Sequence, residues 1–282
     1  MSKLDHLVPI NNVCNQKCVF CSAEYRMQGN KPIPLKNIFK DILEKGDYIQ
    51  ISGGEPLLSP DLFKILFFIR KHKKKCFIEF QTNGVFLLKN NNLDKLQKFN
   101  IDLYNVNYPC HIEEINDEIA GVKGSQTLRE LAMKEIINRG LNLRINIIIN
   151  KLNFIYLPEI VDYINENFAG LDRIQFSFTK AMGAADKNDE VVPLYEETEK
   201  FLINALEKCE KYNIKVDVDH IPMCFLGKYY EKHVDFNKMK MGENGVFLTE
   251  KNYVNRCNNC DKKNYCTGYR KDYLEIYTES II

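Results

Sequence analysis

The sequence has no excess of either charge and no long apolar run. Lys and Arg number 39 and Asp and Glu number 38, so the formal net charge is +1. This balance creates no general attraction to nucleic acid or to an anionic membrane surface. No apolar run approaches the roughly 20 residues that span a bilayer, and the first residues, MSKLD, do not begin a signal peptide. We therefore expect a cytoplasmic protein without a membrane partner, and we do not expect nucleic acid as its partner.

The chain is long enough for a large folded domain. Its 282 residues are 45% hydrophobic, which is enough to bury a substantial core. The sequence contains no internal repeats and no low-complexity tracts. One large domain, alone or with a smaller appended domain, fits this length.

Strand-like and helix-like segments alternate along the first two thirds of the chain. Apolar runs typical of β-strands occur at 6–10, 48–52, 77–82, 103–108, 143–149 and 174–179. Helical spacing of apolar residues occurs at 35–43, 59–74, 93–99, 128–138 and 156–167, with Ser59 predicted as a helix N-cap. Six strand–helix units in series predict a parallel sheet with helices outside it. Six are too few to close an eightfold barrel, so we expect an α/β fold with a partial (β/α)6 barrel.

The polar motifs follow the predicted strands directly. CNQKCVFC (14–21) follows the first strand and SGGEP (52–56) follows the second. TNG (82–84) and NYPCH (107–111) end the third and the fourth. In parallel α/β sheets, chemistry collects at the carboxyl ends of the strands. One rim is therefore expected to receive three thiols, two glycines and several polar side chains.

Six of the ten cysteines form two tight groups in the sequence. In a reducing compartment, clustered cysteines bind metal more often than they form disulfides. The first group is one thiolate short of a closed zinc site, for which His111 could be a fourth ligand. Three thiolates can also hold three irons of a 4Fe–4S cluster and leave the fourth iron open. The other four are Cys76, Cys110, Cys209 and Cys224, of which Cys76 and Cys209 are expected to be small buried side chains.

The first cysteine group and the glycine motif together resemble a known family. CxxxCxxC after a first strand, Phe20 before the last cysteine, and GGEP after a second strand are similar to the radical S-adenosylmethionine (radical SAM) superfamily. The resemblance extends over residues 5–185. It implies that Cys14, Cys18 and Cys21 ligate a 4Fe–4S cluster whose open iron chelates S-adenosylmethionine (AdoMet).

The resemblance also implies contacts to AdoMet near this cluster. Phe20 would lie near the adenine. Gly53 and Gly54 would let the backbone approach the amino group closely. Glu55 would pair directly with that ammonium group through its carboxylate.

Further candidates for ribose or carboxylate contacts lie at the ends of the later strands. Relatives in this branch often have a serine where Asn107 stands, and an amide can still hydrogen-bond a ribose hydroxyl. The other candidates are Asn150, Asn153, Ser177 and Lys180. The alternative for each is a polar residue that caps the following helix, and we favour this alternative for Asn153.

The second cysteine group, Cys257-x2-Cys260-x5-Cys266, resembles the core of the SPASM and twitch domains that are appended to radical SAM proteins. No cysteine follows Cys266, so the resemblance implies a single auxiliary 4Fe–4S cluster, as in the twitch arrangement. Cys224 follows a strand-like segment at 214–219, which could form a hairpin or an edge strand beside this group. We favour Cys224 as the fourth thiolate. The alternative is that Cys224 is a buried thiol and that one auxiliary iron is open to substrate.

Two domains are therefore expected, a radical SAM core at 1–190 and a twitch-like domain at 191–282. The implied cofactors are AdoMet and two 4Fe–4S clusters, one open for AdoMet and one auxiliary. The implied activity is reductive cleavage of AdoMet to a 5′-deoxyadenosyl radical, which abstracts hydrogen from a substrate. A reducing partner such as flavodoxin or ferredoxin would supply the electron.

Several functions remain open at this point. We favour a peptide maturase that forms a crosslink or an epimerised centre. The alternatives among enzymes are a small-molecule dehydrogenase and a nucleotide rearrangement enzyme. GGEP and the polar strand ends disfavour a non-catalytic iron–sulfur redox carrier. The charge balance and the missing fourth ligands disfavour a zinc-dependent nucleic-acid-binding module.

Overall fold

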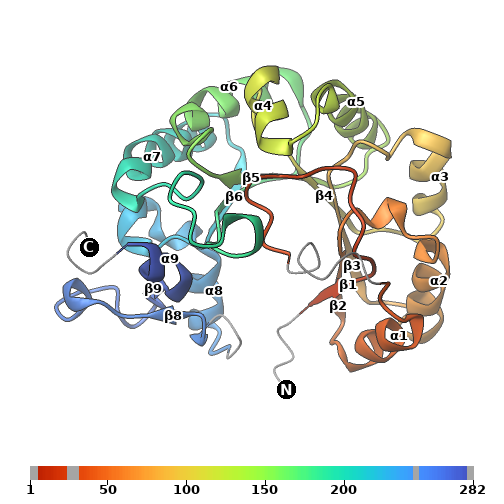
Figure 1. Cartoon of the computed structure of the whole chain (residues 1–282), viewed down its shortest axis with the longest axis horizontal. Helices are drawn as coiled ribbons and strands as arrows, with labels where there is room; N and C mark the ends of the chain where they lie inside the picture. Colours follow the sequence, from red (N-terminus) through yellow and green to blue (C-terminus); the bar gives the residue numbers. More distant parts are fainter. Residues whose placement is uncertain (1–5, 24–31, 244–247, 278–282) are drawn as a thin grey trace.

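The computed structural model describes residues 6–23, 32–243 and 248–277. In these residues, seven parallel strands form one curved sheet and follow one another in the order of the chain (Figure 1). The strands are β1 (Leu7–Pro9), β2 (Tyr48–Ser52), β3 (Phe77–Thr82), β4 (Leu103–Asn107), β5 (Leu143–Ile149), β6 (Arg173–Phe178) and β7 (Lys215–Asp219). β1 and β7 do not pair with each other, so the barrel is open on one side.

Helices surround the convex side of this sheet, which has the outline of a letter C (Figure 1). They are α1 (Leu35–Glu44), α2 (Leu62–His72), α3 (Asn92–Gln97), α4 (Glu113–Ala120), α5 (Ser125–Asn138), α6 (Leu157–Asn167) and α7 (Tyr195–Lys211). None of the helices within the described residues is both long enough and apolar enough to cross a bilayer.

The predicted partial α/β barrel is confirmed, and the sheet has one strand more than expected. The six predicted strands are β1 to β6. The segment at 214–219 forms the edge strand β7, which pairs in parallel with β6 from Arg173↔Lys215 to Ser177↔Asp219. It therefore extends the sheet of the barrel, whereas we had assigned it to the C-terminal domain. The domain boundary at 190/191 stays a prediction.

Two details of the helices differ from the prediction. α2 begins at Leu62 with Asp61 in the N-cap position, so Ser59 is not the cap. The Ser59 hydroxyl instead accepts a hydrogen bond from the Asp61 N–H at 3.4 Å, in the turn that precedes the helix. α4 was not predicted, because its eight residues are too short to establish a clear helical period.

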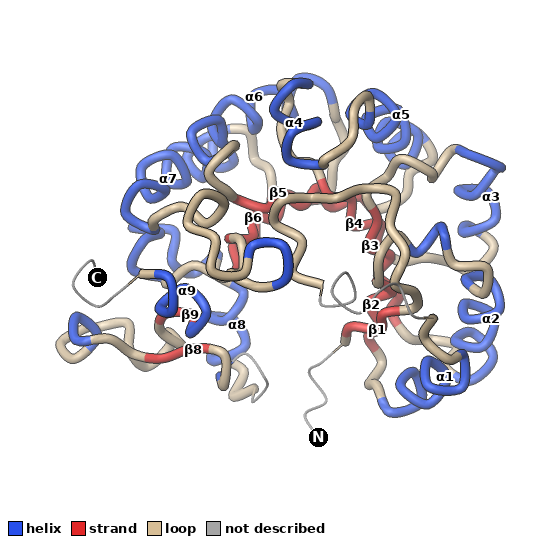
Figure 2. The backbone as a smooth tube through the Cα atoms, viewed as in Figure 1, coloured by secondary structure: helices blue, strands red, loops and turns tan. Residues whose placement is uncertain are grey.

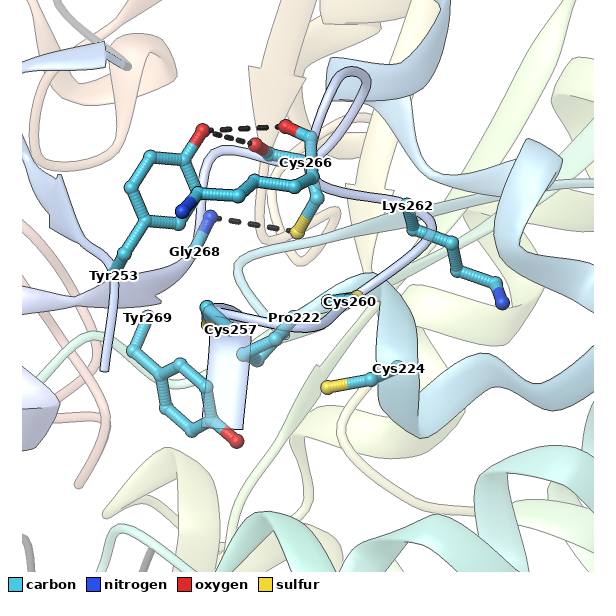
Figure 3. A pocket seen from close by; sticks show the side chains of 10 residues that line it. Pro222, Cys224, Tyr253, Cys257, Cys260, Lys262, Cys266, Gly268 and Tyr269 are labelled. Carbon is cyan, nitrogen blue, oxygen red and sulfur yellow. Dashed lines mark hydrogen bonds between the residues drawn. The ribbon is translucent and has the colours of Figure 1, made fainter. Parts of the chain in front are cut away.

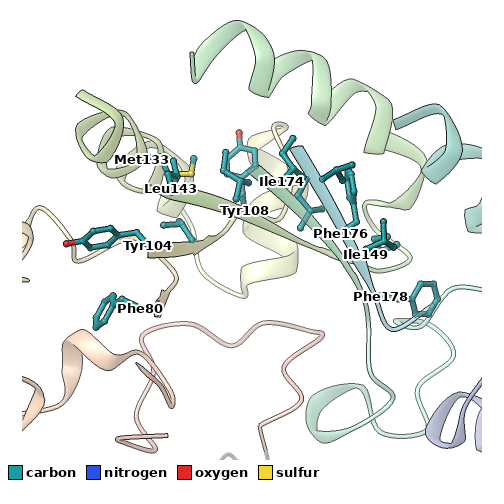
Figure 4. Close-up of a cluster of buried hydrophobic side chains, with 14 of the residues drawn as sticks. Phe80, Tyr104, Tyr108, Met133, Leu143, Ile149, Ile174, Phe176 and Phe178 are labelled. Carbon is teal, nitrogen blue, oxygen red and sulfur yellow. The ribbon is translucent and has the colours of Figure 1, made fainter. Parts of the chain in front are cut away.

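The apolar core lies between the outer face of the sheet and the helices. Along β5, residues Leu143, Ile145, Ile147 and Ile149 are buried, and they alternate with more accessible positions. Figure 4 shows side chains of β4, β5 and β6 packed together in this layer, among them Tyr104, Ile174 and Phe176. Cys76 and Cys209 are buried in the same core, as predicted.

The inner, concave face of the sheet is polar, which we had not predicted. The Glu79 carboxylate on β3 is fully buried and forms an ion pair with Arg144 on β5. It also accepts hydrogen bonds from Asn105 Nδ2 (2.7 Å) and Gln50 Nε2 (3.1 Å). Burial acts to raise the pKa of Glu79, but Arg144 and the hydrogen-bond donors outweigh burial and lower it. Glu79 is therefore an anion inside the barrel.

The C-terminal segment packs beside β7 (Figure 1). It consists of the 3-10 helix η6 (Met223–Lys232), the helix α8 (Val234–Lys240), the antiparallel strands β8 (Lys251–Asn252) and β9 (Tyr269–Arg270), and the helix α9 (Lys271–Ile276). Tyr273 of α9 stacks on Tyr195 of α7 with ring centroids 3.7 Å apart, and its hydroxyl accepts a hydrogen bond from the Tyr195 N–H at 3.1 Å. This contact joins the segment to the barrel.

We expect Tyr273→Ala to lower the free energy of unfolding by about 3–5 kcal/mol, because it removes a large buried ring and leaves a cavity. Urea denaturation followed by circular dichroism measures this loss. Phe67→Ala is the control, since that ring is 64% exposed and its removal is expected to change stability by no more than about 0.5 kcal/mol. Equal stability of the two variants would contradict the stack as the joint between α7 and α9.

Candidate functional site

The loop after β1 carries the first cysteine group and crosses the concave side of the sheet (Figure 2). Its three partly buried cysteines are Cys14, Cys18 and Cys21. The Lys17 N–H donates to the Ala120 carbonyl at 2.9 Å, which ties the loop to the last turn of α4. The Cys21 N–H donates to the Cys18 carbonyl at 3.1 Å and closes a tight turn that contains the half-buried Phe20.

The GGE loop after β2 is hydrogen-bonded to the residues just before Cys14. The Gly54 N–H donates to the Asn11 carbonyl at 3.0 Å, and the Glu55 N–H donates to the Val13 carbonyl at 2.8 Å. In return, Asn11 Nδ2 donates to the Glu55 carbonyl at 2.8 Å. The two strand-end loops therefore hold each other in place, as expected for motifs at one rim of the sheet.

The two glycines of this loop are explained by the close approach of the two backbones. A Cβ on Gly54 would lie 2.0 Å from the Val13 carbonyl oxygen, so no residue with a side chain fits at this position. Gly53 has φ +143°, and a Cβ there would lie 2.7 Å from the Asn11 carbonyl oxygen. Their predicted approach to the AdoMet amino group stays a prediction.

The Glu55 carboxylate holds the loop that follows β3. It is 1% exposed, and it accepts hydrogen bonds from the Asn83 N–H (2.8 Å), the Thr82 hydroxyl (2.8 Å) and the Leu57 N–H (3.2 Å). Burial raises the pKa of Glu55 to about 7, although the three donors favour the ionised form. The structure therefore gives Glu55 a role within the protein, and its direct pairing with the AdoMet ammonium stays a prediction.

Asn83 connects the same loop to the first cysteine. Its side-chain Nδ2 donates to Asn15 Oδ1 at 2.8 Å and lies 3.9 Å from the Cys14 sulfur. The Gln16 N–H also donates to that sulfur, at 3.4 Å. Burial nevertheless raises the pKa of the Cys14 thiol. We quoted the TNG motif but did not select Asn83 as a site residue, because its spacing alone does not indicate a contact with Cys14.

The loop after β6 contacts the first cysteine group and the helix α9. The Ala184 N–H donates to the Cys21 carbonyl at 2.8 Å, and the Ala181 N–H donates to Asp272 Oδ2 at 2.7 Å. Asp272 belongs to α9, which follows the second cysteine group in the sequence. Lys180 lies at the start of this loop, with its Nζ 4.0 Å from Glu250 Oε2.

Asn107 and Ser177 converge on one residue of the concave face. Asn107 Nδ2 donates to the Asn146 carbonyl at 3.3 Å, and the Ser177 hydroxyl donates to Asn146 Oδ1 at 3.1 Å. We had not selected Asn146, although its polar side chain alternates with isoleucines along β5. The contact of Asn107 and Ser177 with the ribose of AdoMet stays a prediction.

Asn150 and Asn153 form a buried turn at the end of β5. The Asn150 N–H donates to Asn153 Oδ1 at 2.8 Å, and Asn150 Oδ1 accepts from the Leu152 N–H at 3.0 Å. Asn153 Nδ2 donates to the Pro109 carbonyl at 2.9 Å and thereby ties the ends of β4 and β5 together. Both residues have no exposed surface. Asn153 occupies the N-cap position of the 3-10 helix η4 (Phe154–Tyr156), in line with the favoured interpretation, but its side chain makes no capping hydrogen bond.

The second cysteine group lines a small hollow in the C-terminal segment (Figure 3). The hollow has a volume of about 300 Å³, part of it open to solvent, and its lining includes Cys224, Cys257, Cys260 and Cys266. Cys224 lies in the first turn of η6, just after Pro222, which also lines the hollow. The fold therefore brings together four cysteines that are separated by up to 42 positions in the sequence.

The charge state of Cys224 depends on what occupies this hollow. Burial raises the pKa of the Cys224 thiol to about 11, with Arg256 acting in the opposite direction. Cys266 and Cys257 also raise this pKa, because a thiolate at either position would repel one at Cys224. Cys224 is therefore a neutral thiol at neutral pH, and a metal centre at this position would have to displace its proton.

Several cations of the C-terminal segment are paired with carboxylates. Arg270 is 3% exposed and pairs with Glu250 (2.8 Å) and Asp272 (2.9 Å). Lys251 forms a buried ion pair with Asp235. The remaining pairs are Arg256 with Glu196 and Lys262 with Asp261. Of the two lysines that line the hollow, Lys262 has such a partner and Lys263 lies over the ring of Tyr253.

The donor chemistry of both groups fits iron–sulfur centres, which are held by cysteine thiolates. Cys14 has two N–H donors to its sulfur, and four thiols surround the C-terminal hollow. As the side chains stand, no three His, Cys, Asp or Glu residues in the described part of the chain are arranged to hold a single metal ion. The fit therefore rests on the type of donor and on the hollow.

A family model described as the Radical SAM superfamily matches residues 8–164. Among curated proteins, the PqqA peptide cyclase of Gluconobacter oxydans is 24% identical over 191 residues, which cover 66% of this chain and 52% of that protein. A probable GTP 3′,8-cyclase of Methanococcus maripaludis strain C7 is 27% identical over 266 residues, which cover 92% of this chain and 78% of that protein. The chain thus spans about half the length of the peptide cyclase.

Solved structures show the same fold. A structure of native anSMEcpe with bound AdoMet and the Cp18Cys peptide has a TM-score of 0.69 at 14% identity, covering 96% of this chain and 89% of that one. Streptococcus suis SuiB bound to its precursor peptide SuiA has a TM-score of 0.61 at 19% identity, covering 76% of this chain and 47% of that one.

We expect Glu55→Gln to destabilise the protein by about 1–3 kcal/mol. The carboxylate accepts three hydrogen bonds, and the glutamine NH2 group cannot accept any, so one buried donor would lose its acceptor. Urea denaturation measures the loss. Glu207→Gln is the matched control, since it removes the same charge from an exposed position on α7. If both variants were as stable as the unmodified protein, the carboxylate would not hold the loop after β3.

Proposed function

Because the chain belongs to the radical SAM superfamily, we propose that Cys14, Cys18 and Cys21 hold the 4Fe–4S cluster that this family uses with AdoMet. When the cluster and AdoMet are bound, they supply reductive cleavage of AdoMet and abstraction of hydrogen from a substrate. The protein is thus a radical SAM enzyme, and the proposals below concern its ligands and its substrate.

The residues of this chain would hold and orient the two groups. The GGE loop and Asn83 fix the position of the cysteine loop, and Asn83 Nδ2 and the Gln16 N–H stabilise negative charge on the Cys14 sulfur. Asn107 and Ser177 present amide and hydroxyl groups to the concave face, where they would bond the ribose or carboxylate of AdoMet. Phe20 would cover the adenine.

A second, auxiliary 4Fe–4S cluster would be held by Cys224, Cys257, Cys260 and Cys266. The observation that carries this proposal is the single hollow that all four cysteines line. Four thiolates would ligate every iron, so this cluster would transfer electrons and would not bind substrate. This arrangement resembles a twitch domain.

We propose that the substrate is a peptide in which the enzyme makes a crosslink or inverts a centre. One relative is named a peptide cyclase, and one of the fold neighbours that cover almost the whole chain carries a bound peptide. The pairing of the C-terminal cations with carboxylates supports a substrate without several phosphates.

A nucleotide rearrangement is the second candidate. The observation that favours it is the match to a probable GTP 3′,8-cyclase over 92% of this chain. A triphosphate would need several cations near its site, and in the C-terminal segment Arg270, Lys251 and Arg256 are already held in ion pairs.

Mass spectrometry distinguishes the two substrates. The protein is co-expressed with the short peptides encoded beside its gene, and in a separate reaction the reconstituted enzyme is incubated with GTP, AdoMet and a reductant. A crosslink lowers the peptide mass by two hydrogens, whereas an inverted centre keeps the mass and is detected by deuterium uptake when the co-expression is carried out in D2O. We expect one of these two changes, lost in Cys14→Ala, and no conversion of GTP. A modified GTP together with unmodified peptides would overturn the peptide proposal in favour of the nucleotide one.

We expect anaerobically reconstituted protein to hold about eight irons per chain, four for each cluster. Replacing Cys14, Cys18 and Cys21 with Ala should leave about four, because only the auxiliary cluster remains. Iron and sulfide analysis measures the content of the unmodified protein and of the triple variant. Cys209→Ala is the control, because it changes only a buried core thiol. Retained zinc with iron near zero would contradict both clusters.

We expect Cys224→Ala to leave the auxiliary cluster labile and to shift its spectrum and potential, because ligand identity sets both. The measurement uses the variant that already lacks Cys14, Cys18 and Cys21, so that one cluster is observed alone. AdoMet cleavage, assayed with the first group intact, should continue. An unchanged spectrum and potential would show that Cys224 is not a ligand.

A further inference from the structure

A buried arginine lies behind the first cysteine group. Arg129 projects from α5 and has no exposed surface. Its Nε donates to the Asn83 carbonyl at 2.9 Å, and its NH1 donates to Asn116 Oδ1. Its NH2 group is buried without a hydrogen-bond partner. A guanidinium in this condition is costly unless a negative charge nearby compensates for it.

The hydrogen-bond partners of Arg129 do not supply that negative charge. The Asn83 carbonyl and the Asn116 amide are neutral oxygens. The neighbouring carboxylate on α5, Glu130, accepts hydrogen bonds from the hydroxyls of Tyr108 (2.6 Å) and Tyr163 (3.0 Å). Arg129 therefore has a buried positive charge that its own hydrogen bonds do not neutralise.

A thiolate at Cys18 would act on Arg129 more strongly than the other acidic groups near it. Burial lowers the pKa of Arg129 to about 10, so it is still charged at neutral pH. A negative charge on Cys18 opposes this shift more than Tyr108, Asp117 or Glu130 does. Since Arg129 also bonds Asn83, which lies within reach of the Cys14 sulfur, it is linked to two members of the group.

We propose that Arg129 is the buried counter-charge of the anionic centre held by Cys14, Cys18 and Cys21, and that it makes one-electron reduction of that centre easier. Reduction adds a negative charge to a site that three thiolates already make anionic. A fixed positive charge in a low dielectric stabilises the reduced form more than the oxidised form. Arg129 acts through the centre and is a positioning residue, and the inference rests on the proposed ligands of the first cluster.

The test is a redox titration of the reconstituted full-length protein with dithionite, followed by electron paramagnetic resonance. The signal of the first cluster is identified as the one that AdoMet alters. We expect Arg129→Met to shift its midpoint to a more negative potential by about 59 mV or more, which is a tenfold change in a one-electron equilibrium. Arg139→Met is the matched control, because it removes the same charge from the C-cap of the same helix, where the guanidinium is partly exposed and paired with Asp94 and Glu135, and the midpoint should not move.

A second variant keeps the arginine and cancels its charge. Asn116→Asp is isosteric and places a carboxylate against the Arg129 NH1 group, so we expect a negative shift as in Arg129→Met. Midpoints equal to that of the unmodified protein in Arg129→Met and Asn116→Asp, at full iron content, would overturn the proposal. If Arg129→Met binds no iron, Asn116→Asp decides alone.

The remaining outcomes are also decisive. If neither variant binds iron, Arg129→Lys decides. Iron binding with an unchanged midpoint supports the role of the positive charge. Loss of iron overturns the proposal, because the arginine would then be needed for its packing. If the unmodified protein binds no iron, the proposed function fails first, and the inference falls with it. Failure of the inference alone appears as full iron content with an unmoved midpoint.

Discussion

The hydrogen-bonded approach of two backbones organises the rim of this barrel. The GGE loop after β2 lies so close to residues 11–13 that the Val13 carbonyl occupies the place of a Cβ on Gly54. From this contact the Glu55 carboxylate reaches Asn83, and Asn83 reaches the first cysteine. The position of the cysteines therefore depends on residues that contribute no sulfur. A single methyl group at Gly54 would separate the two loops.

The polarity of the concave face follows from the openness of the barrel. A closed barrel fills its interior with packed apolar side chains, whereas a sheet whose edge strands do not pair leaves its concave side accessible to ligand and water. The apolar core of this protein is accordingly on the outer face, beneath the helices (Figure 4). On the inner face, the Glu79–Arg144 ion pair is enclosed by amides that satisfy the carboxylate, which makes a buried charge tolerable.

Much of the fold could be predicted because periodicity and motif position are local properties. The six strands before residue 180 are visible as apolar patterns, and the cysteine and glycine motifs follow strands. The role of β7 could not be predicted, because KVDVD gives the same alternation in a hairpin as at the edge of a barrel. Glu55 could be selected from its motif, but its three internal donors come from residues up to 28 positions away and exist only in the fold. Arg129 and Asn146 carry no motif, so their positions near the site depend on tertiary packing.

The loop after β6 makes the two cysteine groups mechanically dependent on each other. At one end the Ala184 N–H bonds the Cys21 carbonyl, and a Cβ on Gly183 would lie 2.4 Å from the same oxygen. Near its other end the Ala181 N–H bonds Asp272, whose carboxylate also pairs with Arg270, four positions after Cys266. Only two residues, Met182 and Gly183, separate the two anchors, so the loop has little length to absorb a displacement. A shift of the C-terminal segment would therefore be transmitted to the turn between Cys18 and Cys21, and the barrel and the segment must fold into one unit for both groups to reach their positions.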